Sequence, residues 1–92
     1  MTTLWEPRIM NAPIHRFDLL ISQTPAALPT ILNTFADLAL TPARVSTHKH
    51  KNSLQSVTII LRQLADQDVR AIEKSLRQSD LVRTVSLEHM LT

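Results

Sequence analysis

The chain of 92 residues contains no cysteine and no glycine. Without cysteine it can form no disulfide, no thiolate nucleophile and no cysteine metal site. Without glycine it lacks the Gly-rich phosphate loops and dinucleotide fingerprints, because only glycine adopts their tight backbone geometry at low cost. Those nucleotide-binding motifs and the cysteine-based chemistries are therefore excluded.

Long apolar runs and a strong charge excess are absent as well. No apolar run approaches the length of a membrane span, and residues 1–14 lack the basic start, apolar core and small-residue cleavage site of a secretory signal. The net charge is only +2, from ten basic and eight acidic side chains, so it is weak evidence for nucleic-acid binding. We expect one cytoplasmic globular domain with a modest core and no membrane contact.

The first half of the chain predicts a strand followed by a helix. Residues 15–22 alternate, with Phe17, Leu19 and Ile21 on one face, as a half-buried strand does. Thr24 suits a helix cap and Pro25 the first helical position, so a helix is predicted from residue 25 to about residue 38. The predicted buried stripe consists of Leu28, Ile31, Leu32, Phe35 and Leu38.

The second half repeats this pattern. Strands are predicted over residues 43–49 and 56–62, joined by a turn in which Asn52 is best able to take a left-handed conformation. The first of these strands is polar enough for a sheet edge, and the second is a β-branched run that suits a central position.

A second helix is then predicted with Asp66 as its cap, and its charges follow the helix dipole. Its buried stripe is Val69, Ile72 and Leu76. A last strand covers residues 81–88, before a short tail from His89.

The order strand, helix, strand, strand, helix, strand predicts an α+β, ferredoxin-like βαββαβ sandwich. A four-stranded antiparallel sheet carries both helices on one face, with strands 15–22 and 56–62 in the centre. We divide the chain into an N-terminal arm (residues 1–14) with Trp5 as its one large anchor, a domain (15–90) and a tail (91–92).

The sheet face without helices is predicted to show Leu20 and Ile60 among polar side chains. Both are too apolar for free solvent, so we expect this face or a sheet edge to meet another chain. Because the core is also small, a homodimer is expected.

The ionisable side chains form no catalytic constellation, so we expect no enzyme activity and no metal. His48 and His50 have a spacing that a metal could use, but a solvated hairpin tip explains them better. His15 and His89 are single histidines near strand ends, which surface positions explain as well as any function does. RNA binding is disfavoured, because the central strands offer only Phe17, and it faces the helices.

The turn before the first helix is the strongest candidate for binding. Its free N–H donors could hold an anion or a small zwitterion, although most such turns bind nothing. The segment Gln23-Thr24-Pro25-Ala26-Ala27-Leu28 resembles the Asn-Glu-Ser-Gly-Ala-Leu-like turn of ACT domains, in particular that of the short small (regulatory) subunits of acetolactate synthase. Phe35, the segment Leu81–Ser86 and the element lengths are also similar, so the resemblance covers residues 15–90.

This resemblance implies a non-catalytic, ACT-type regulatory subunit that binds and modulates the acetolactate synthase catalytic subunit in branched-chain amino-acid synthesis. Thiamine diphosphate, magnesium and FAD would then belong to that partner. The alternative is a free-standing amino-acid-sensing module with an unrelated target.

The same resemblance implies an amino-acid effector site at Gln23, Ala26 and Thr41, where the family more often has Asn, Gly and Asn. These three departures predict weak valine binding or none. Another family glycine corresponds to Ala39, so the first helix is expected to end without the usual left-handed glycine.

Overall fold

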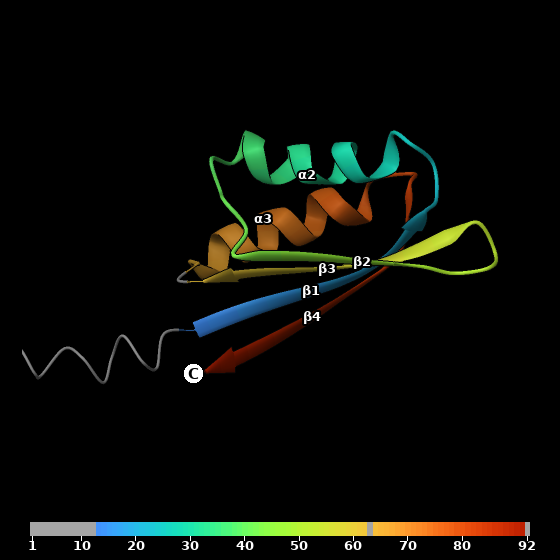
Figure 1. Cartoon of the computed structure of the whole chain (residues 1–92). Coiled ribbons are helices and arrows are strands. Elements are labelled where there is room, and N and C mark those ends of the chain that lie inside the picture. The colour runs from blue at the N-terminus through green and yellow to red at the C-terminus, as the bar shows by residue number, and fades with distance from the viewer. Residues whose placement is uncertain (1–12, 63, 92) are drawn as a thin grey trace, which may run out of the picture.

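The computed structural model describes residues 13–62 and 64–91. Its elements are β1 (Pro13–Ser22), α2 (Ala27–Asp37), β2 (Arg44–Lys49), β3 (Leu54–Arg62), α3 (Asp66–Arg77) and β4 (Val82–Leu91). The strands form one antiparallel sheet in the order β2-β3-β1-β4, with both helices on the same face (Figure 1). The predicted ferredoxin-like fold is confirmed, with β1 and β3 central and β2 at an edge. Trp5 and the rest of the arm up to residue 12 lie outside the described residues, as does Thr92.

The core lies between the sheet and the helices. Phe17 of β1 is fully buried, and its ring meets that of Phe35 edge-on with centroids 6.2 Å apart. This confirms that Phe17 faces the helices. The predicted stripe of α3 is buried, and from α2 the buried residues are Ala27, Ile31 and Phe35. Leu38, predicted in the buried stripe of α2, is instead 40% exposed.

Both predicted helix caps are wrong. The N-cap of α2 is Ala26 and that of α3 is Ala65, and neither makes a side-chain cap hydrogen bond. Thr24 contributes its backbone carbonyl instead, which accepts the N–H of Ala27 at 3.1 Å. A turn therefore precedes α2 and moves its start two residues past Pro25. Asp66 is the first residue of α3, where its carboxylate still lies favourably for the helix dipole.

The end of α2 takes a left-handed conformation without glycine. Ala39 has φ 58°, the N–H of Ala39 bonds to the Ala36 carbonyl, and the N–H of Leu40 bonds to the Phe35 carbonyl, both at 2.9 Å. These two bonds form a Schellman motif, which usually has glycine at the left-handed position. The Schellman motif therefore forms without glycine. Holding Ala39 in the left-handed conformation costs about 1–2 kcal/mol of conformational free energy.

The β2–β3 hairpin turns at residues 51–53, as predicted, but the left-handed residue is Ser53 (φ 59°) and not Asn52. The N–H of His50 bonds to the Leu54 carbonyl at 2.9 Å and closes a three-residue loop. Such loops place their left-handed residue last, which explains why the conformation falls on Ser53.

β4 is longer than predicted and includes the segment expected to be a tail. It runs to Leu91, because β1 already begins at Pro13 and pairs with it from there. The start of β1 and the end of β4 therefore lie side by side.

Candidate functional site

The sheet face without helices has a polar centre. Asp18 accepts a hydrogen bond from the Thr58 hydroxyl at 2.8 Å and forms an ion pair with Arg16 at 3.0 Å. Each carboxylate oxygen takes part in one of these contacts, so Asp18 is paired on both oxygens within the sheet.

Leu20 and Ile60, the predicted interface residues, lie on either side of this polar centre. Leu20 pairs with Ser56 and Ile60 with Arg16, so the two are separated by four positions along β1, about 13 Å. Each is half-buried. The structure therefore does not bring them together as one patch: Ile60 stands in a row between Arg44 and Arg16, and Leu20 stands among shorter polar side chains.

The predicted effector residues are also divided within one copy of the chain. Gln23 and Ala26 precede α2, whereas Thr41 follows it, and the helix of 11 residues separates them by about 16 Å. The backbone N–H of Gln23 bonds to the Ser53 carbonyl at 2.9 Å, so this loop is attached to the tip of the β2–β3 hairpin. Within a single copy the three predicted residues therefore do not form one cluster.

His15 and His89 form a pair that sequence reasoning missed. His15 is 3% exposed, and its Nδ1 lies 2.8 Å from the Nδ1 of His89, with the rings edge-on. The interpretation of His15 as a surface residue is wrong. The alternation that buries Phe17, Leu19 and Ile21 places His15 on the same inner face, and this signal could have found it.

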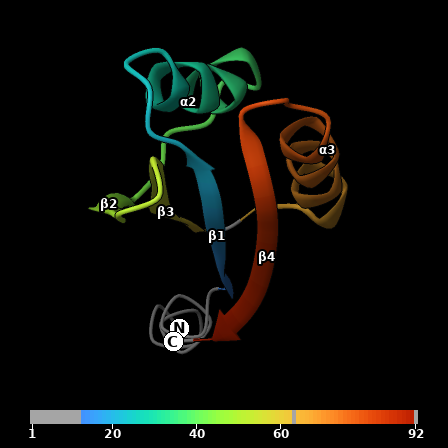
Figure 2. The same cartoon turned by 90° about the vertical axis from the view of Figure 1, so that its right-hand side faces the viewer.

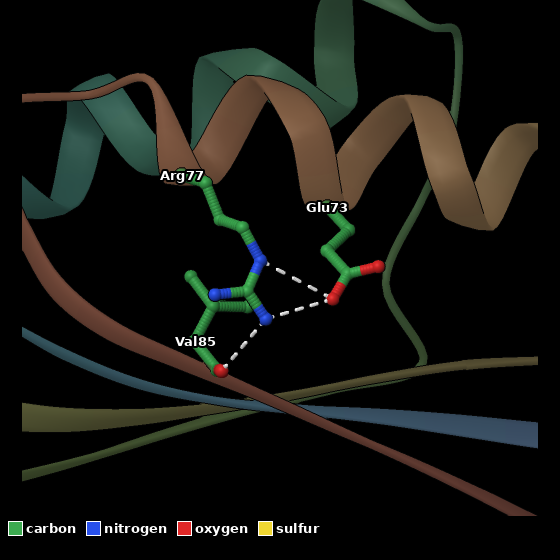
Figure 3. Close-up of polar contacts among 3 residues, drawn as sticks. All are labelled: Glu73, Arg77 and Val85. Atoms are coloured by element: carbon green, nitrogen blue, oxygen red, sulfur yellow. Dashed lines mark hydrogen bonds and ion pairs between the residues drawn. The ribbon is translucent and has the colours of Figure 1, made fainter.

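A shallow cavity of about 220 Å³ lies between α3 and β4, beside His89. Its lining consists of Asp66, Val69, Arg70, Glu73, Leu87 and His89. Next to it, Arg77 donates from Nη2 to Glu73 at 2.9 Å and to the Val85 carbonyl at 3.3 Å (Figure 3). Arg77 therefore connects α3 to β4.

The other histidine pair lies on the exposed β2–β3 hairpin. His48 and His50 have ring centroids 5.0 Å apart, and Nε2 of His50 is hydrogen-bonded to the Ser56 hydroxyl. Among residues 13–62 and 64–91, no three His, Asp or Glu side chains form a group that could hold a metal. The same part of the chain contains no helix long and apolar enough to cross a membrane.

No family model and no curated protein matches this sequence. Among solved structures, the ligand-free regulatory subunit of aspartate kinase from Thermus thermophilus is similar, with a TM-score of 0.64 and 13% identity over 86% of this chain and 56% of that one. A homoserine dehydrogenase from Thiobacillus denitrificans has a TM-score of 0.68 and 12% identity over 89% of this chain and 18% of its own. The C-terminal domain of the MgtC protein from Mycobacterium tuberculosis has a TM-score of 0.67 and 12% identity over 87% and 88% of the two chains.

These similarities establish the fold. The chain has a ferredoxin-like architecture that is similar in fold to the regulatory subunit of aspartate kinase. Similarity of fold alone does not identify a partner or a ligand, because one fold supports many functions.

Proposed function

We propose that this chain is a regulatory subunit that binds the catalytic subunit of acetolactate synthase and modulates its activity. The observation that supports this best is the ACT-like fold, similar to the regulatory subunit of aspartate kinase. The resemblance of residues 23–28 to the turn of acetolactate synthase small subunits narrows the proposal to that enzyme.

The arrangement of the ionisable groups suits a regulatory role. Asp18 and Glu73 are paired with arginines, and the Nδ1 atoms of His15 and His89 are bonded to each other. The Ser56 hydroxyl does have the His50 imidazole beside it, but this pair lies on the exposed β2–β3 hairpin, and no carboxylate is hydrogen-bonded to His50 among the described residues. The thiamine diphosphate, magnesium and FAD of the holoenzyme belong to the catalytic partner in this proposal.

The regulatory subunit acts as a homodimer in this proposal. Gln23 and Ala26 lie at one end of α2 and Thr41 lies beyond the other, so an effector site that uses all three takes residues from two copies. Modulation then requires that the dimer contact one state of the enzyme better than another. Ile60, about 13 Å from Leu20 on the uncovered sheet face, is the contact proposed for it.

The test is acetolactate formation by the purified catalytic subunit with and without this protein, together with gel filtration of the mixture. We expect a complex and a changed rate or effector response. Ile60→Asp should abolish the complex and the change in rate or effector response. A carboxylate at this half-buried position would have to be desolvated in the interface. The helix content of this variant should remain that of the unmodified protein.

Two further variants make this test specific. Leu38→Asp places the same charge at an exposed leucine on the helix side of the sheet and should leave the complex intact. Ile59→Asp places it in the core, where Ile59 is fully buried, and should unfold the domain. If the unmodified protein forms no complex and leaves the rate and effector response unchanged, the assignment to acetolactate synthase is wrong, and a free-standing amino-acid sensor replaces it.

A further inference from the structure

The cavity between α3 and β4 combines charges of both signs with an apolar surface. α3 packs along β4 at one edge of the sheet (Figure 2). The cavity of about 220 Å³ lies between them, with Asp66 and Arg70 on the helix and His89 on the strand. Buried Val69 and half-buried Leu87 supply its apolar part. No function described so far uses this cavity.

Asp66 and Arg70 face the cavity without a charged partner. They lie four positions apart on α3, with the acidic residue first, which is the favourable spacing and order for an ion pair on a helix surface. They nevertheless form none. The ion pairs among the described residues involve other side chains, and of these Glu73 borders the cavity, where Arg77 holds it. Within the described part of the chain, the cavity therefore presents one carboxylate and one guanidinium that are both unpaired.

The hydrogen bond between His15 and His89 determines which proton faces the cavity. Their Nδ1 atoms are bonded, so one ring donates there and the other accepts. If neutral His15 accepted, its proton would sit on Nε2, which is buried and has no partner among the described residues. Buried N–H groups without an acceptor are rare, because the lost hydrogen bond is costly. The proton between the two rings is therefore assigned to Nδ1 of His15.

This assignment leaves a hydrogen-bond donor on the cavity side of His89. When Nδ1 of neutral His89 accepts, its proton is on Nε2, which is the ring nitrogen left for a ligand. Arg70 adds guanidinium N–H donors at the same cavity, and a carboxylate accepts from such groups. A simple anion would also meet the carboxylate of Asp66, which repels it. A ligand that carries an ammonium group as well as a carboxylate satisfies all three side chains.

We propose that this cavity binds a small zwitterion with a carboxylate and an ammonium group, such as a free amino acid with an aliphatic side chain. The carboxylate accepts hydrogen bonds from Nε2 of His89 and from Arg70. The ammonium group donates to Asp66, and the aliphatic part lies against Val69 and Leu87. The site is separate from the effector residues at the two ends of α2, and it does not depend on acetolactate synthase being the partner.

The probe is L-leucine, added to isotope-labelled protein and followed by NMR. We expect saturable shifts of the Asp66, Arg70 and His89 amides at millimolar leucine, while the amides of residues 23–27 stay in place. Two matched compounds each lack one charge: isocaproate has no ammonium group, and isoamylamine has no carboxylate. Each should bind about tenfold more weakly than leucine, because a charged side chain of the cavity is left without its partner.

Charge variants on α3 assign each contact. Arg70→Gln should weaken leucine binding about tenfold and leave isoamylamine unaffected, since that amine has no carboxylate. Asp66→Asn should weaken leucine by a similar factor but should not weaken isocaproate, which has no ammonium group. Lys74→Gln and Asp68→Asn are the matched controls, because they remove the same charges from the same helix outside the cavity lining. Both controls should bind leucine as the unmodified protein does. A general loss of stability would not produce this pattern.

NMR of the imidazole nitrogens tests the proton assignment directly. His15 should be protonated at Nδ1 and His89 at Nε2, and leucine should shift the Nε2 resonance of His89. The proposal is overturned if these tautomers are reversed, if leucine does not bind, or if isocaproate or isoamylamine binds as tightly as leucine. It is also overturned if Arg70→Gln weakens leucine binding no more than Lys74→Gln does. Leucine that shifts only residues 23–27 overturns it as well, but would leave an amino-acid effector in the proposed function intact.

Discussion

His15 and His89 face each other across the β1–β4 pair, with a hydrogen bond between their Nδ1 atoms at 2.8 Å. One of the two rings donates this hydrogen and the other accepts it, so the bond requires at least one neutral imidazole. His15 is almost fully buried, and its Nε2 has no hydrogen-bond partner among the described residues. The two histidines therefore form a polar contact on the inner face of the sheet. Nδ1 of His15 has a hydrogen-bond partner, and Nε2 of His15 has none among the described residues.

The first prediction concerns this pair. His89→Ala should destabilise the domain by about 1–3 kcal/mol, because it leaves the second nitrogen of buried His15 without a partner. The double variant His15→Leu with His89→Leu removes both partners and should be close to neutral. Urea unfolding of the single and double variants measures the difference, and equal losses for the two would show that the hydrogen bond carries no weight.

The second prediction concerns the end of α2. Ala39→Gly should stabilise the domain by about 1 kcal/mol, because Ala39 holds a left-handed conformation that glycine adopts without a steric cost. Ala36→Gly, three residues earlier and inside the helix, is the matched control and should destabilise by a similar amount. Opposite shifts in thermal unfolding confirm the prediction, and a loss of stability in both variants contradicts it.

The third prediction is dimerisation. Light scattering should give twice the mass of the chain at concentrations used for assays, and Leu20→Asp should shift the mass toward the monomer, because a charge in the interface must be desolvated. Leu38→Asp, on the helix side, should leave the dimer unchanged. A mass equal to one chain at every concentration would refute this.

The fourth prediction is the response to valine. Titration calorimetry should show weak valine binding or none, because Ala26 has a methyl group at a position where the ACT-domain turns that residues 23–28 resemble more often have glycine. The triple variant Gln23→Asn, Ala26→Gly, Thr41→Asn should gain affinity. Micromolar binding of valine by the unmodified chain would contradict this prediction.

Periodicity was sufficient to predict the topology. The alternation around Phe17 and the β-branched run around Ile59 identified the two central strands, and the polar character of residues 43–49 identified an edge. Burial of apolar side chains determines these features, and it leaves a direct pattern in the sequence.

The helix caps and the left-handed turn residue could not be predicted from residue preferences, because local backbone geometry determines them. Ala26 and Ala65 serve as helix caps without a side-chain bond, and Ser53 takes the left-handed position because the loop length requires it there. His15 was missed for another reason: its polarity suggested the surface, while its position in the alternation placed it inside. For the candidate site, the sequence predicted Leu20 and Ile60 on one face with polar side chains such as Asp18 and Thr58. It did not predict the contact between Asp18 and Thr58, because cross-strand neighbours depend on register.

The hydrogen bond from the Gln23 N–H to the Ser53 carbonyl has a mechanical consequence. It is reinforced by the Gln55 side-chain amide, which donates to the Ser22 carbonyl at 3.2 Å. These two bonds connect the segment that enters α2 to the tip of the β2–β3 hairpin. A ligand that moved Gln23 away from this position would therefore have to break a backbone hydrogen bond to the β2–β3 hairpin.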